Sequence, residues 1–154
     1  MVLRLSELPE AERVHLAGIA CEAMAGRPWV AAAPLARRRI AIVSTAGLQM
    51  RGDRAFSYGD GDYRVIPGDA DARDVVMSHV SVNFDRTGFQ QDLNVVFPID
   101  RLKELAAAGT IGSVAAFHYS FMGAMDPKNA AASAHGLAGL LRKDRVDAVV
   151  LCPV

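Results

Sequence analysis

Small residues follow the first strongly apolar run of the chain, in the stretch STAGL at residues 44–48. Ser44, Thr45 and Gly47 leave room for backbone N–H groups to approach an anion or a carboxylate. The stretch lacks the glycine spacing of the nucleotide-binding loops GxGxxG and GxxxxGK[ST]. Two interpretations are open: an ordinary turn after a strand, or a substrate-binding loop.

Polar side chains are densest in residues 78–94, and this stretch contains His79, Asp85, Asp92 and Asn94. An imidazole titrates near neutral pH and a carboxylate can orient it, so His79 and Asp85 are candidates for acid–base catalysis. Asp92 and Asn94 are candidates for substrate binding. The same side chains could instead cap turns or bind a metal ion. We predict the catalytic and substrate-binding roles, and no metal site.

The stretch FHYSFMG, residues 117–123, brings His118 and Ser120 to the end of another expected strand. We predict that both belong to the catalytic site. Ser120 lacks the GxSxG pattern of a hydrolase nucleophile, so a serine-hydrolase triad is weakly supported. A hydrogen-bonding role for both residues in a half-buried strand is the alternative.

The two cysteines, Cys21 and Cys152, lie far apart and lack the CxxC or Cys/His spacing of a zinc site. Cys152 follows an apolar run, where a thiolate could meet a substrate. No neighbouring residue in the sequence would lower its pKa, so we interpret it as a small buried apolar residue rather than a nucleophile.

Four apolar runs predict the strands that position these residues. They cover residues 40–43, 75–78, 114–117 and 149–151, and a shorter candidate covers residues 63–66 at a sheet edge. Apolar residues at helical spacing predict helices over residues 98–108 and 127–142, with Asp126 and Pro127 opening the second. We expect the four main strands to be neighbours and mainly parallel.

Alternating strands and helices predict an α/β fold, a three-layer sandwich with a mostly parallel sheet. We expect it to be flavodoxin- or Rossmann-like and incomplete at its C-terminus. The 154 residues suit a single α/β domain. Residues 1–36 form a helical N-terminal extension within it, with a helix over residues 6–25 and Ser6 as its N-cap. In a parallel sheet, the loops that carry the candidate residues converge at one edge.

The composition argues against some classes of binding partner. The 17 basic and 17 acidic residues cancel and are dispersed apart from residues 37–39, which argues against a nucleic-acid partner. No apolar run approaches the roughly 20 residues that span a bilayer, and the N-terminus lacks a signal-peptide core. We therefore expect a cytoplasmic protein without a membrane partner, and a homo-oligomer is compatible with the sequence.

Several motifs together resemble the glycine/sarcosine/betaine reductase selenoprotein B family. They are STAGL, YRVIPG, the run from His79 to Gly123 and the closing VDAVVLCPV. The block D-x-N-x-x-F-P-I-D-R-L at residues 92–102 is the most specific of them. In that family selenocysteine typically follows a strand of the DAVVLxPV kind. The resemblance therefore implies a selenocysteine directly after Val154. It also implies that this chain is the N-terminal part of a longer selenoprotein, truncated at an in-frame TGA codon and inactive alone.

The resemblance further implies reductive cleavage of a carbon–nitrogen bond in a small amino acid or amine. In the family a selenolate attacks the activated carbon, the amine leaves, and the carbon fragment passes to a selenoprotein A-like carrier. Activation comes from a pyruvoyl group on a partner subunit. This chain itself is expected to hold no cofactor.

Two other classes of function remain open. One is a non-catalytic α/β module that binds a small carboxylate or serves in assembly. The other is a metal-dependent hydrolase built on His79 and the nearby acidic residues, which would require a bound metal ion. A selenocysteine codon downstream favours the reductase, whereas a true stop codon favours the binding module.

Overall fold

The computed structural model describes residues 4–18, 26, 30–81 and 86–154, and it divides the chain into two compact units, residues 1–31 and 32–154. The first unit contains the 3-10 helix η1 (Leu5–Glu7) and the helix α1 (Glu10–Ala17). Pro9, which is extended, occupies the N-cap of α1, so the prediction of Ser6 as N-cap is wrong. The residue before a proline is disfavoured in the helical region, and this delays the start of the helix. Residues 19–25 of the expected helix lie outside the described residues.

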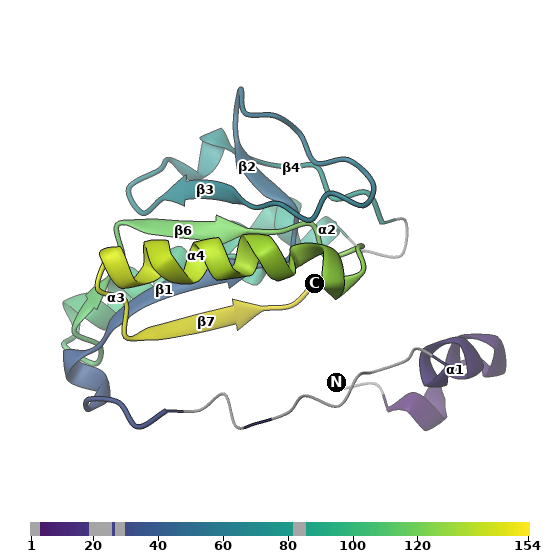
Figure 1. Cartoon of the computed structure of the whole chain (residues 1–154), viewed down its shortest axis with the longest axis horizontal. Helices are drawn as coiled ribbons and strands as arrows, with labels where there is room; N and C mark the ends of the chain where they lie inside the picture. The colour runs from purple at the N-terminus through teal and green to yellow at the C-terminus, as the bar shows by residue number, and fades with distance from the viewer. Residues whose placement is uncertain (1–3, 19–25, 27–29, 82–85) are drawn as a thin grey trace. The chain divides into compact units, whose positions relative to one another are not determined.

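The second unit contains a five-stranded sheet, shown in Figure 1. Its central strand is β1 (Arg39–Ser44), which confirms the strand expected at residues 40–43. β1 pairs in parallel with β7 (Ala148–Cys152) along one edge, which confirms the final expected strand. Along its other edge β1 pairs in parallel with β5 (Ser113–Val114) and β6 (Phe117–Ser120).

β5 and β6 form one interrupted strand beside β1. Ile40 pairs with Val114 and Val43 pairs with Tyr119, so the chain from β5 to β6 has two residues more than β1 between these two pairs. The extra residues form a bulge, which bends the strand and redirects its side chains. The single strand predicted over residues 114–117 is therefore divided, and a sequence pattern of period two does not reveal such an insertion.

Two further strands pair antiparallel to their neighbours. β3 (Arg64–Pro67) pairs with β6 at the edge of the sheet, where a short strand was expected. β4 (Val75–Met77) pairs with β2 (Leu48–Met50) in a separate two-stranded sheet. The prediction that residues 75–78 join the parallel sheet is thus wrong. An apolar run identifies a strand but not its partner. β4 can pair antiparallel with β2 directly, whereas pairing in parallel with a strand of the main sheet would need a crossover connection.

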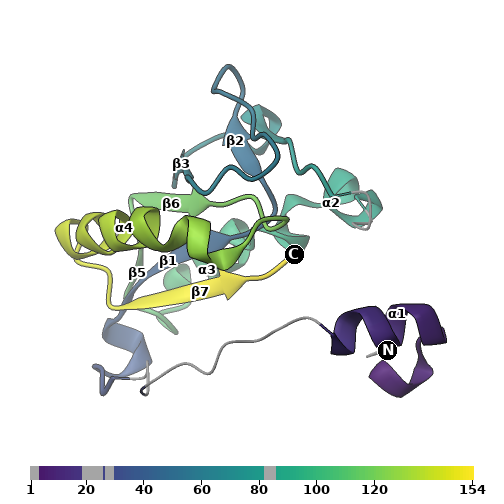
Figure 2. The same cartoon turned by 45° about the vertical axis from the view of Figure 1, so that its right-hand side comes forward.

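Helices cover both faces of the sheet (Figure 2). α3 (Ile99–Ala107) buries Leu102 against a core that contains Ile42 of β1. α4 (Ala131–Lys143) buries Leu137 on the opposite face, against Tyr119 of β6. The three-layer α/β sandwich with a mostly parallel sheet is confirmed, and the narrower flavodoxin- or Rossmann-like assignment stays a prediction.

Short elements complete the described chain. They are the helix α2 (Thr87–Gln91) and the 3-10 helices η2 (Leu35–Arg37), η3 (Ala72–Asp74), η4 (Leu93–Val95) and η5 (Pro127–Ala130). The side chain of Asp126 accepts the N–H of Lys128 at 3.0 Å, which confirms the expected start of the second helical segment. No helix in the described ranges is long and apolar enough to cross a bilayer.

Candidate functional site

The C-terminal residue is held at the carboxyl end of β1. The N–H of Val154 donates to Thr45 Oγ1 at 2.8 Å, and the Thr45 hydroxyl lies 3.3 Å from the Val154 carbonyl oxygen. The backbone N–H of Thr45 also donates to the carbonyl of Cys152 at 3.0 Å. These three contacts fix the backbone that follows β7.

Gly123 closes the other side of this position. Its N–H donates to the Thr45 carbonyl at 2.8 Å. A Cβ atom on Gly123 would lie 2.8 Å from the Val154 carbonyl oxygen and 2.9 Å from that of Thr45. Glycine is therefore required here for the loop after β6 to approach the loop after β1 and the end of the chain.

Gly47 is the point where the segments that follow three strands meet. Its N–H donates to the carbonyl of Phe121, which follows β6, and its carbonyl accepts the N–H of Ser78, which follows β4, both at 2.9 Å. Its φ of +66° lies in the left-handed region, and a Cβ atom there would lie 2.9 Å from Cα of His79. The structure thus places Gly47 and His79 in direct contact, although β4, the strand before His79, lies outside the parallel sheet.

His79 is buried, with 4% of its surface exposed. Its Nδ1 accepts the N–H of Ser81 at 3.2 Å, and its carbonyl accepts a hydrogen bond from the Arg86 guanidinium. Burial, and then the positive charge of Arg86, lower the pKa of the imidazole. The ring is therefore neutral at neutral pH. Asp85, the expected carboxylate partner, lies outside the described residues.

His118 and Ser120 are fully buried in the sheet. Nδ1 of His118 accepts the N–H of Ile42 at 2.9 Å, and Ser120 Oγ accepts the N–H of Leu48, also at 2.9 Å. Among the described residues, Nε2 of His118 has no hydrogen-bond partner. Both side chains satisfy backbone groups, which supports the structural alternative, and their catalytic roles stay predictions.

The remaining predicted substrate-binding side chains form hydrogen bonds within the chain. Ser44 Oγ donates to the carbonyl of Val96 at 2.9 Å and accepts the N–H of Ala46 at 3.2 Å. Asp92 accepts the side-chain and backbone N–H groups of Asn94, which lower the pKa of its carboxyl. Asn94 Oδ1 accepts the N–H of Asp100 at 3.0 Å at the start of α3. Their substrate-binding role stays a prediction.

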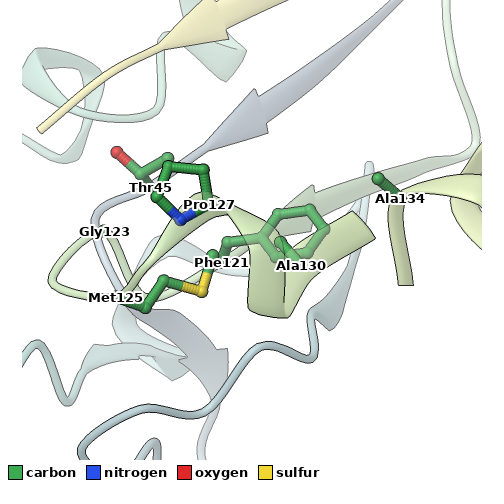
Figure 3. Close-up of a pocket in the computed structure, with 7 residues that line it drawn as sticks. All are labelled: Thr45, Phe121, Gly123, Met125, Pro127, Ala130 and Ala134. Atoms are coloured by element: carbon green, nitrogen blue, oxygen red, sulfur yellow. The ribbon is translucent and has the colours of Figure 1, made fainter. Parts of the chain in front are cut away.

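An apolar pocket of about 260 Å³ adjoins Thr45 and Gly123, on the side of α4 (Figure 3). Five further residues line it: Phe121, Met125, Pro127, Ala130 and Ala134. None of these five was a sequence candidate, because apolar side chains look alike in a core and in a pocket. The glycine of the turn after residues 117–120 was the one available signal.

The described part of the chain contains no cluster of side chains that could bind a metal ion. No group of three or more His, Cys, Asp or Glu side chains is placed there to hold an ion. Burial raises the pKa of the Cys152 thiol, and that side chain packs against the core on the α3 face.

Comparisons with known proteins agree with the motifs. The sequence model of the glycine/sarcosine/betaine reductase selenoprotein B family matches residues 27–154. D-proline reductase subunit gamma of Acetoanaerobium sticklandii is 36% identical over 115 residues, covering 73% of this chain and 47% of the relative. Glycine reductase complex component B subunit gamma of Carboxydothermus hydrogenoformans is 31% identical over 123 residues, covering 76% of this chain and 28% of that relative. No solved structure matches the chain significantly.

The chain thus spans less than half the length of either curated relative. Both relatives are named as subunits of reductases, and the second as part of a complex. The family match extends over most of the chain, including β1, the pocket and the closing strand. The chain therefore belongs to the glycine/sarcosine/betaine reductase selenoprotein B family.

Proposed function

We propose that this chain is part of a selenocysteine-dependent reductase component that cleaves a carbon–nitrogen bond of a small amino acid or amine. The selenocysteine would follow Val154 directly. Family membership supports a reductase-complex component, and the names of the relatives, D-proline reductase and glycine reductase, supply two candidate substrates. The observation that carries the proposal is the hydrogen bond between Val154 and Thr45 at the carboxyl end of β1.

The residues around Val154 fit a reactive residue at the next position. Loops at the carboxyl ends of strands carry binding and catalytic groups in α/β sheets. A selenol is ionised at neutral pH and supplies a nucleophile there without a neighbouring base. Thr45 and Gly123 fix the backbone from which that residue would extend, and such fixed backbones reduce the cost of orientation in a reaction.

Reductive cleavage of a carbon–nitrogen bond consumes two electrons and two protons, because the amine leaves with one hydrogen and the carbon gains the other. We assign proton handling to His79, with Asp85 as its expected partner. At neutral pH the lowered pKa leaves His79 able to accept a proton, and its charged form then donates that proton readily. A thiol-class reductant supplies the electrons, and a pyruvoyl group on a partner subunit activates the substrate.

The test is amine release by the assembled complex. The gene, with its downstream reading frame, is expressed with the partner subunit in a host that incorporates selenium. Release of amine from D-proline, glycine and betaine is then measured with a thiol reductant. We expect release from at least one substrate, and none from protein produced without selenium. A selenium-loaded, assembled complex that releases no amine from any of the three would overturn the proposal.

A further inference from the structure

The pocket beside Thr45 lies on the face of the sheet to which a side chain after Val154 would point. Cys152 and Val154 both pack against the core on the α3 face. Side chains alternate between faces along an extended chain, so the next side chain falls on the opposite face. That face is the one that carries α4, because Leu151 pairs with Val43, and Val43 packs against the cluster that contains Leu137 of α4. At Leu151 itself, which is 71% exposed, the face is open to solvent.

The lining of the pocket is almost entirely apolar. Its residues come from the loop after β1, the loop after β6 and the helical segment η5–α4 (Figure 3). Thr45 contributes the one side-chain hydroxyl, and that hydroxyl is engaged by the Val154 backbone. An apolar wall of this kind stabilises hydrocarbon and offers no compensation for a buried charge.

The volume limits what the pocket holds. At about 260 Å³ it lies just below the range of roughly 300–1,000 Å³ that is usual for ligand pockets. It suits a ring or short chain of a few carbons rather than a nucleotide, a folded peptide segment or a large cofactor. The charged carboxylate and amine of an amino acid would remain outside, toward Val154 and solvent.

We propose that this pocket binds the hydrocarbon ring or side chain of the amino-acid substrate and selects against glycine. This inference rests on the proposed function, and it assigns the substrate class. Each buried methylene raises affinity about fourfold. The three ring methylenes of proline, which glycine lacks, therefore give a preference on the order of 50-fold. The relative named as a D-proline reductase makes D-proline the appropriate probe.

The binding test uses the 154-residue chain itself, because the pocket is formed within it. Methyl-labelled protein is titrated separately with D-proline and with glycine, and the alanine methyl signals are followed by NMR. We expect saturable shifts of the Ala130 and Ala134 signals with D-proline, and an affinity for glycine at least tenfold lower.

Variants then locate the binding. Ala134→Leu fills the pocket, and Ala130→Leu fills it from another side. Ala132→Leu is the matched control, because Ala132 lies exposed on the same helix and does not line the pocket. We expect both pocket variants to lose D-proline binding at least tenfold and the control to keep it. Amide spectra show whether each variant is folded. One folded pocket variant is sufficient to test whether D-proline binds in the pocket.

Equal affinity for the two amino acids, the absence of saturable D-proline shifts, or D-proline binding unchanged in a folded pocket variant would each overturn the pocket assignment. None of these results bears on selenium-dependent amine release by the complex. Conversely, a complex without reductase activity leaves the binding result intact, so the two proposals fail separately.

Discussion

Nδ1 of His118 accepts the backbone N–H of Ile42 at 2.9 Å, so a side chain takes the place that a strand carbonyl would occupy between β1 and β6. The two extra residues of the bulge displace the β6 backbone from Ile42, and the imidazole fills the gap. The Phe97 ring packs perpendicular to the imidazole, with ring centroids 5.6 Å apart and planes at 89°. The middle of the parallel sheet thus depends on one neutral histidine.

The first prediction concerns this hydrogen bond. His118→Phe keeps an aromatic ring but leaves the buried Ile42 N–H without an acceptor, which should reduce the free energy of unfolding by about 1–3 kcal/mol. His118→Asn retains an acceptor near the position of Nδ1. Amide hydrogen exchange of Ile42 separates the two variants: we expect faster exchange in the Phe variant and retained protection in the Asn variant. Unchanged Ile42 protection in His118→Phe would rule out the bridging role.

The second prediction is a loss of stability in acid. Burial, followed by the charges of Lys103 and Arg39 against the opposing effect of Asp144, lowers the pKa of His118 to about 4. The unfolded chain has the ordinary value of 6.5, so between these values it binds a proton that the folded chain does not. Stability should therefore fall as pH falls from 6.5 toward 4, by up to about 3 kcal/mol.

Urea unfolding of the wild type and of His118→Phe, across pH 4 to 7, isolates this contribution. The variant should lack most of the slope, because it has no imidazole at this position. Equal slopes in the two proteins would mean that the acid sensitivity originates elsewhere.

The third prediction concerns Asp144, which holds the bulge from the α4 side. Its carboxylate accepts the Arg39 guanidinium at 2.6 Å and the N–H of Ala116 at 2.8 Å. Burial raises the pKa of this carboxyl, but these hydrogen bonds outweigh it and the net pKa is lowered. Asp144→Ala should cost about 2–3 kcal/mol of stability, since it removes the acceptor of the partly buried Arg39 guanidinium and of the Ala116 N–H.

The matched control is Glu104→Ala, which removes the exposed ion pair with Arg101 at 2.9 Å on α3. An exposed pair of this kind contributes roughly 0.3–0.5 kcal/mol. Chemical denaturation of both variants gives the comparison. Similar losses in the two would show that Asp144 acts only as a surface charge.

The fourth prediction concerns the contact between Gly47 and His79. Gly47→Ala introduces both a positive φ for alanine and a Cβ atom 2.9 Å from the His79 backbone. Gly52→Ala introduces a positive φ alone, because nothing lies within 4 Å of the added atom. We expect a loss of about 1 kcal/mol for Gly52→Ala and at least twice that for Gly47→Ala. Only the Gly47 variant should shift the NMR signals of the His79 ring, and unmoved His79 signals would argue against the contact.

Much of the fold follows from local pattern. The apolar runs of β1 and β7 and the helical spacing of α3 and α4 identify the right elements, because each buries one face in a core. Which strands pair with each other is harder to predict from the sequence. β4 was expected in the parallel sheet, yet it pairs with β2 through backbone hydrogen bonds that any sequence can form. The bulge beside His118 could not be predicted either, because it too depends on backbone pairing rather than on residue type.

The candidate site shows the same division. Thr45, Gly47 and His79 were predicted from loop chemistry at strand ends, and the structure brings Gly47 against His79 and Thr45 against Val154. Their roles in a site stay predictions. The pocket residues Phe121 and Ala134 carry no polar signal, so only the packing of η5 and α4 beside the β1 and β6 loops identifies them. Apolar sites are built by topology, which sequence pattern alone does not supply.

The most direct test of the proposed function is the DNA sequence that follows the codon for Val154. The account predicts an in-frame TGA codon there, followed by an open reading frame that continues the homology to the longer relatives. It also predicts selenium in the product of that frame, with the element located at the residue after Val154 by mass spectrometry. A TAA or TAG codon at this position, or a TGA with no reading frame beyond it, would contradict a selenocysteine at the end of β7.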